Sequence, residues 1–476
     1  MSEEVLSLSA AELVARYRSK RLSPVEVTQA VLGRIGRLDP IYNAFVLVDG
    51  ERALADARAS EARWTQGMPL GPVDGVPATV KDLILARGWP TLRGSRTIDP
   101  HQEWTEDGPP VARLREAGAV LLGKTTTPEF GWKGVTDSPL TGLTLNPWDT
   151  RLTPGGSSGG AAVAAALGMG VLHLATDGGG SIRIPAGFCG CFGFKPTFGI
   201  VPVHPHSPAG TLWHQGPISR TVVDAALMMT IIARPDARDW SQVPSLGVDF
   251  RQGLEDGIAG LRICYSRTLG YARVDPEVAA LVDQAARRLE VLGAKVEEID
   301  VALEDPISIM QPLWSVALAL AVAPLTHEQR ALMDQPLLAL AEAGLHLTAL
   351  DYRRLERARE AFAQHMHRLH QTYDVLLTPQ LAVTAFEVGH QVPPQGTFTH
   401  WWEWSPFSYP FNLTQQPAAT VPCGFTAAGL PVALQLVGAK FADALILRAA
   451  RAYEVAHPFV MPRPNSRAEG RVAGAE

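Results

Sequence analysis

Cysteine and lysine are scarce in this chain, and a strong net charge is missing. The chain contains 4 cysteines in 476 residues, so a disulfide framework is not expected. Cys189 and Cys191 form a C-x-C pair without the second pair that would complete a zinc site, and we expect buried thiols there. Charged residues make up 19% of the chain and the net charge is −6. These values exclude a disordered chain and a strongly basic nucleic-acid binder.

Long apolar runs are also missing. The longest stretches, near 161–175 and 316–325, fall short of the ~18 residues that a membrane span needs. The N-terminal sequence is acidic and lacks the basic and apolar regions of a signal peptide. We therefore expect a soluble, cytoplasmic protein that binds neither membrane nor nucleic acid.

Strand and helix patterns alternate along most of the chain. Ser9 with Glu12, and Ser23 with Glu26, form capping boxes that open two helices. The alternation that follows predicts an α/β fold: a large mixed, mostly parallel β-sheet covered by helices on both faces. We divide the chain into N-terminal helices (1–65), a catalytic α/β core (66–300), a helical and loop elaboration over a substrate pocket (302–410) and a return to the core (411–476), all in one domain (1–476).

The sequence TPGGSSGG at 153–160 precedes an alanine-rich helix. A phosphate-binding loop is excluded, because no lysine followed by serine or threonine ends the motif. Residues 155–159 match the G-x-S-x-G nucleophile elbow, with Ser157 as its nucleophile. A tight turn that ends in an N-cap serine is an equal alternative.

A second loop, DGGGSIR at 177–183, follows a short strand. Its glycines permit a bend in which successive N–H groups converge on one oxygen and stabilise an oxyanion. Ser181, directly after the glycines, is a candidate nucleophile. The alternative is a flexible loop.

Lys81 ends the apolar strand at 76–80. The chain has 7 lysines against 35 arginines, and only lysine can lose its proton when burial lowers its pKa. Lys81 is therefore a candidate base, with an ion pair to Asp82 as the alternative. No S-x-x-K motif occurs, so a lysine base must reach a serine from a separate strand.

These motifs resemble those of the amidase signature family over nearly the whole chain. The resemblance includes CGCFGFKP at 189–196, PFNLTQQPAATVP at 410–422 and the 24-residue spacing of Ser157 and Ser181. It implies an amide hydrolase without metal or cofactor, in which Ser181 is the nucleophile, Ser157 bridges after a cis peptide and Lys81 is the base. It also implies an oxyanion hole from the N–H groups of Gly178, Gly179, Gly180 and Ser181, support from Ser158, Asp177 and Arg183, and an acyl pocket at Phe130, Gly131 and Trp132.

The segment after Lys195 resembles stand-alone serine amidases, such as aryl acylamidases, nylon-oligomer amidases and urethane-cleaving enzymes, more than the A component of the transfer-RNA amidotransferase. Trp402 and Phe407, in an aromatic stretch, favour binding of a bulky apolar or aryl amide, with packing under a loop as an equal alternative. A carbamate undergoes the same attack. Two other hypotheses stay open: an α/β-hydrolase-type esterase that uses Ser157, and an amidotransferase subunit that acts with partner chains. The self-assembly that we expect is a homodimer.

Overall fold

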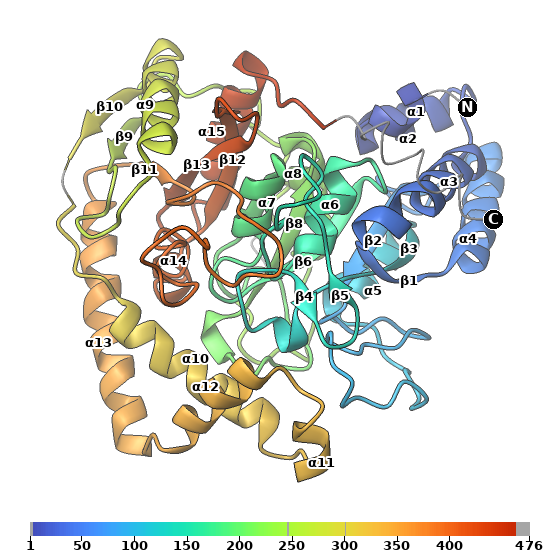
Figure 1. Cartoon of the computed structure of the whole chain (residues 1–476). Coiled ribbons are helices and arrows are strands. Elements are labelled where there is room, and N and C mark those ends of the chain that lie inside the picture. The colour runs from blue at the N-terminus through green and yellow to red at the C-terminus, as the bar shows by residue number, and fades with distance from the viewer. Residues whose placement is uncertain (1–2, 245–246, 300, 463–476) are drawn as a thin grey trace.

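The computed structural model describes residues 3–244, 247–299 and 301–462 (Figure 1). Within them, eleven strands pair in one sheet and a two-stranded hairpin, β4 (Asp137–Ser138) with β5 (Gly142–Leu143), stands apart. From one edge to the other, the large sheet contains β1 (Phe45–Val48), β3 (Val120–Thr125), β2 (Pro77–Lys81), β6 (Leu172–Asp177), β8 (His214–Ser219), β7 (Phe192–Lys195), β12 (Ala418–Phe425), β13 (Pro431–Gly438), β11 (Val375–Pro379), β9 (Arg262–Tyr265) and β10 (Lys295–Glu298).

The sheet is mixed, as expected, but less parallel than the alternation of elements predicts. Strands β3, β2 and β6 run parallel, as do β11, β9 and β10. Between these groups, β8, β7, β12 and β13 pair antiparallel with every neighbour. Glycine and proline interrupt β7, β8 and β12, for example at Gly193 and Pro217, so their strand pattern is weak and the sequence analysis missed them.

Helices surround the sheet, and two of them begin at the capping boxes that the sequence predicts. Ser9 and Ser23 each accept the N–H of the glutamate three residues on, which accepts a hydrogen bond in return, so both capping boxes are confirmed. The helices outside the 302–410 segment are α1 (Glu3–Ser7), α2 (Ala10–Arg18), α3 (Pro24–Tyr42), α4 (Gly50–Gln66), α5 (Pro109–Glu116), α6 (Gly159–Ala166), α7 (Arg183–Cys189), α8 (Val222–Ile232), α9 (Pro276–Val291), α14 (Pro410–Leu413) and α15 (Asp443–Ala456).

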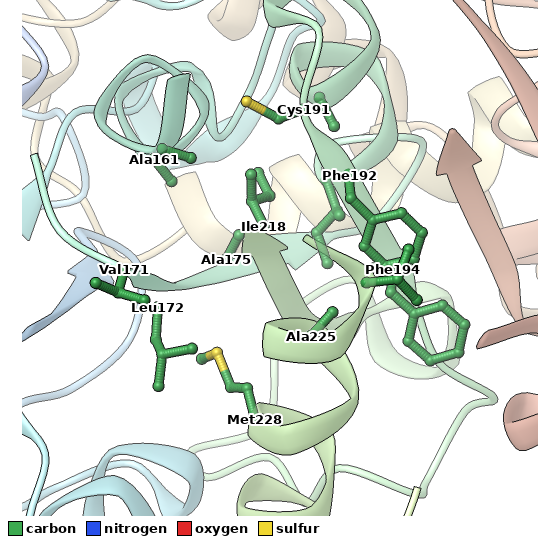
Figure 2. Packing of buried hydrophobic residues seen from close by; sticks show 14 of the residues in the cluster. Ala161, Val171, Leu172, Ala175, Cys191, Phe192, Phe194, Ile218, Ala225 and Met228 are labelled. Carbon is green, nitrogen blue, oxygen red and sulfur yellow. The ribbon is translucent and has the colours of Figure 1, made fainter. Parts of the chain in front are cut away.

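The main core fills the space between these helices and the central strands. Figure 2 shows Ala161 of α6 and Met228 of α8 with the strand residues Ala175 and Ile218 between them, so helices cover both faces. Cys191 also lies in this core, as a buried free thiol. Cys189 is likewise buried and free, as the sequence predicts.

Four helices form the expected elaboration: α10 (Ile307–Val322), α11 (His327–Arg330), α12 (Gln335–Leu345) and α13 (Ala349–Leu369). They lie along the left side and the bottom of Figure 1, outside the sheet. A second apolar cluster joins this layer to the loops of the core, and it contains Trp132, Trp314 and Trp402. Among the helices of the described ranges, none is long and apolar enough to cross a bilayer.

Candidate active site

Lys81 and Thr176 lie at one edge of the sheet. Strands β2 and β6 are parallel neighbours, with Val80 opposite Leu174, and both end in polar residues. The carboxyl ends of parallel strands meet at the same edge, where α/β proteins place their ligand sites. The fold therefore brings Lys81 next to the strand that leads into the glycine loop.

The Lys81 amine is fully buried and surrounded by hydroxyl groups. Nζ lies 2.7 Å from Ser157 Oγ, 2.8 Å from Ser158 Oγ and 3.0 Å from Thr176 Oγ1. Burial lowers the pKa of Lys81 well below the ordinary lysine value, although the charge of Asp177 opposes this shift. A neutral amine in this position can accept a proton from a serine hydroxyl.

Asp82 is not the partner of Lys81. Its carboxylate lies 3.2 Å from the ammonium group of Lys124, and both side chains are buried. The ion-pair alternative for Lys81 is therefore wrong. Sequence order favoured this pairing, but a strand directs consecutive side chains to opposite faces.

Ser157 follows a cis peptide at Gly156, as the family resemblance implies. A Cβ atom at Gly156 would lie 2.6 Å from the backbone of Val135, so only glycine fits there. Ser158 occupies the N-cap position of α6 but makes no side-chain cap bond. Its hydroxyl donates instead to the carbonyl oxygen of Thr176 at 3.2 Å, so the predicted N-cap serine is present but its side chain does not cap the helix.

Ser181 lies beside the first serine motif, because the N–H of Ser158 donates to the Ser181 carbonyl oxygen at 3.2 Å. The Ser181 side chain is 7% exposed, and its hydroxyl has no hydrogen-bond partner in the part of the chain that the structure describes. The hydroxyl is thus free to rotate towards Ser157 or a substrate.

Asp177 and Arg183 fix the shape of the glycine loop. The Arg183 guanidinium donates to both oxygens of the Asp177 carboxylate, each at 2.9 Å, and both side chains are fully buried. Burial alone would raise the pKa of Asp177, but Arg183 overcomes this and holds it below its usual range. Asp177 stays ionised and can organise the N–H groups around it.

The glycine loop offers fewer free N–H groups than the resemblance implies. The Gly180 N–H donates to Asp177 Oδ1 at 2.7 Å, so it supports the loop and does not point to a substrate oxygen. The N–H groups of Gly178, Gly179 and Ser181 have no partner among the described residues. These three groups are the donors available for an oxyanion.

Asn412 is a site residue without an assigned role in the sequence analysis. Its side-chain amide donates to the carbonyl oxygen of Asp177 at 3.0 Å and to Oδ1 at 2.9 Å, and its Oδ1 accepts from Arg183 at 2.7 Å. The residue sits in the motif at 410–422, which α14 carries back to the site. The available signal was an asparagine between Phe411 and Leu413 in a motif that the family resemblance includes.

Tryptophans pack on the outer side of the glycine loop. A Cβ at Gly178 would lie 2.9 Å from the Trp314 ring, and one at Gly179 would lie 2.8 Å from the Trp402 ring. Trp402 therefore lies beside the loop, but it is buried in the second apolar cluster and outside the lining of the neighbouring pocket, so its role in substrate binding stays a prediction. Phe407 is different: it is fully buried in a separate core cluster with Phe411, so it packs the interior and does not line the site.

The segment at 130–132 borders Ser157. A Cβ at Gly131 would lie 3.2 Å from Ser157 Oγ, and Gly131 has φ +71°. Trp132 is buried; its Nε1 donates to Asp334 at 3.0 Å, and its carbonyl accepts from Trp314 at 3.0 Å. Trp132 thus ties the helical layer to the site, whereas Phe130 lines an open pocket.

This pocket has a volume of about 850 Å³, including space open to solvent. We call it the entry pocket. Its walls come from the loop after β2, the segment at 203–209 and α10. Its apolar side chains include Leu83, Phe130, Val203, Trp213, Trp314 and Leu318. The rings of Trp213 and Trp314 also lie where a Cβ atom on Gly178 would meet them, so the pocket adjoins the glycine loop.

Known proteins are similar to this chain over most of its length. The family model described as Amidase matches residues 26–447. An acylamidase from Rhodococcus erythropolis is 37% identical, over 98% of this chain and 98% of the relative.

The chain belongs to the amidase family. The solved structure of a bacterial aryl acylamidase of the amidase signature enzymes has a TM-score of 0.90 and 30% identity, and each chain is covered completely. The glutamyl-tRNA(Gln) amidotransferase component of the same family from Myxococcus xanthus is 36% identical over 96% of this chain and 98% of the relative. This amidase is therefore an amide hydrolase of the amidase signature type, and the α/β-hydrolase alternative is wrong.

Proposed function

We propose that this amidase hydrolyses bulky apolar or aryl amides, and the corresponding carbamates, through Lys81, Ser157 and Ser181. The observation that supports the proposal most strongly is the 2.7 Å contact between Lys81 Nζ and Ser157 Oγ in a fully buried setting. A buried lysine with a lowered pKa is a competent base for a serine hydroxyl.

In the proposed mechanism, the neutral Lys81 amine takes a proton from Ser157, and Ser157 takes one from Ser181. The Ser181 Oγ then forms a bond to the amide carbonyl carbon, and the π electrons of the C=O bond move to the oxygen. The C–N bond breaks as the proton returns through Ser157 to the nitrogen, which leaves as an amine. Water hydrolyses the resulting acyl-enzyme by the same proton path in reverse.

The negative oxygen of the intermediate would bind to the N–H groups of Gly178, Gly179 and Ser181. Loss of a single oxyanion donor typically costs about 10²–10³-fold in rate. The ion pair of Asp177 with Arg183 contributes by holding this loop in place before the substrate arrives.

The aromatic wall of the entry pocket supports an apolar or aryl substrate. Phe130, Trp213 and Trp314 line it, and the aryl acylamidase structure is similar over the full chain. The scissile carbonyl has the same geometry in an amide and a carbamate, so the proposal includes both.

The second candidate is amide hydrolysis within an amidotransferase, which the Myxococcus xanthus relative supports. The purified chain distinguishes the two functions. We expect it to hydrolyse 4-nitroanilides and aryl carbamates without partners, and the Ser181→Ala variant to lose both activities. Hydrolysis of glutamine alone, with no turnover of anilides, would instead favour the amidotransferase.

A further inference from the structure

Arg93 places a positive charge on the wall of the entry pocket. Its backbone is fixed from both sides: the Arg93 N–H donates to the Asp82 carbonyl at 3.1 Å, and its own carbonyl accepts from Phe130 N–H at 2.7 Å. The residue has φ +56°, an uncommon backbone conformation for arginine. The chain therefore holds Arg93 beside Phe130, at the pocket.

The Arg93 guanidinium has no ion pair and no hydrogen bond with any described residue, although its side chain is partly buried. Asp82 is close enough to act on its charge, but that carboxylate is paired with Lys124 at 3.2 Å. No aspartate, glutamate or lysine belongs to the described lining of the pocket. A guanidinium with no direct ion pair or hydrogen bond in a partly enclosed pocket is suited to binding an anion.

Gln215 also lines this pocket. It is 4% exposed, and its Oε1 is buried with no hydrogen bond in the described structure. Oε1 is an acceptor and cannot bind an anion, so only the NH₂ group of this amide can donate to a ligand oxygen. Arg93 and Gln215 therefore both offer hydrogen-bond donors in a pocket whose polar lining also includes His204, His206 and Ser207.

The other ionisable groups of the wall are His204 and His206. Each already faces an acid: Glu106 lies 3.4 Å from His204, and Asp239 lies 3.1 Å from His206. Glu106 and Asp239 are already engaged with these histidines, and neither forms an ion pair with Arg93 in the described residues.

We propose that the entry pocket binds a carboxylate on the substrate, so that amides with a free carboxylate remote from the scissile bond are favoured. This inference rests on the proposed function of the same site. The carboxylate would accept hydrogen bonds from the Arg93 guanidinium and the Gln215 amide, while the aromatic wall packs on the chain or ring that carries it.

Two matched substrate pairs test the inference and show which half of the substrate enters the pocket. The first pair compares glutaric acid mono-4-nitroanilide, which has a free carboxylate on the acyl side, with pentanoic acid 4-nitroanilide, which has none. The second pair compares 4-acetamidobenzoate, which has the carboxylate on the amine side, with 4-methylacetanilide, which has a methyl group in its place. We expect the carboxylate member of at least one pair to have a kcat/KM about 10- to 100-fold higher, as charge-assisted hydrogen bonds imply.

The Arg93→Met variant should bring that ratio towards one, mainly through the KM of the carboxylate substrate, and Arg93→Lys should retain part of it. Arg96→Met is the matched control, because Arg96 is exposed and outside the pocket lining, and it should keep the wild-type ratio. The wild-type ratio should also fall as salt is added, which requires no variant.

A ratio of one or less for both pairs in the wild type would overturn the inference, as would an unchanged ratio in Arg93→Met. The proposed function is judged separately, by hydrolysis of the neutral anilides and its loss in Ser181→Ala.

Discussion

Ser158 donates its backbone N–H to the carbonyl oxygen of Ser181 at 3.2 Å, which joins two serine motifs that are far apart in sequence. The same residue presents its hydroxyl to Lys81 Nζ at 2.8 Å. One residue thus fixes the lysine and the glycine loop relative to each other. We expect Ser158 to act as a positioning residue, because the proposed proton path depends on the geometry of these two hydrogen bonds.

We predict that Lys81 acts as a base and not only as a positive charge. Lys81→Arg keeps the charge, but arginine cannot lose its proton, so kcat should fall by about 10²–10⁴-fold. Lys295→Arg, on the exposed strand β10, is the matched control and should retain wild-type kinetics. Steady-state kinetics on an anilide measure both. Activity of Lys81→Arg near the wild-type level would show that Lys81 acts through its charge.

The pH dependence follows from the lowered pKa of Lys81. Protonation removes the base, so kcat/KM should rise with pH and level off above the pKa of Lys81, at a midpoint below the ordinary lysine value of 10.5. A pH–rate profile over the range in which the enzyme stays folded measures this midpoint. A rate that falls as pH rises through the same range would mean that the protonated lysine is the active form.

The ion pair of Asp177 with Arg183 is fully buried, and removal of one partner leaves a buried charge alone. Arg183→Met should therefore lower the free energy of unfolding by about 3–5 kcal/mol. Arg151→Met removes an ion pair whose arginine is 85% exposed, and it should leave the denaturation midpoint unchanged. Chemical denaturation compares the two variants, and equal effects would contradict the structural role of Arg183.

Gly131→Ala tests how closely the 130–132 segment approaches the catalytic serines. The added Cβ would lie 2.7 Å from Leu83 Cδ1 and 3.2 Å from Ser157 Oγ, so kcat should fall by about 10- to 100-fold. Gly142→Ala has the same backbone strain, with φ +73°, but nothing lies within 4 Å of its Cβ. An equal loss of kcat in both variants would mean that backbone strain, and not the site, is responsible.

Much of the local structure could be predicted from the sequence, because its signals are local. The capping boxes at Ser9 and Ser23 depend on residues three positions apart, and both form. Lys81 could be located because it ends an apolar strand. The antiparallel centre of the sheet could not be predicted from the sequence. Strands β7 and β8 are short and contain glycine or proline, and their pairing depends on partners that are distant in sequence.

Side-chain partners across the fold were the harder part. Lys124, on a neighbouring strand, forms the ion pair with Asp82, and Asn412 donates a hydrogen bond to Asp177 although the two are more than 200 residues apart in sequence. The hydrogen bond from the Gly180 N–H to Asp177 depends on the conformation of the loop, and a glycine-rich sequence does not specify that conformation. Phe407 could not be told from Trp402 in an aromatic stretch, because neighbouring residues there face different clusters.

The identity of the nucleophile is the central claim, and covalent labelling tests it most directly. The purified protein is treated with a fluorophosphonate, which reacts with activated serines, and the adduct is located by peptide mass spectrometry. We expect the adduct on Ser181, and no adduct in Lys81→Arg under the same conditions. An adduct on Ser157 would contradict the proposed order of proton transfer and the assignment of Ser181.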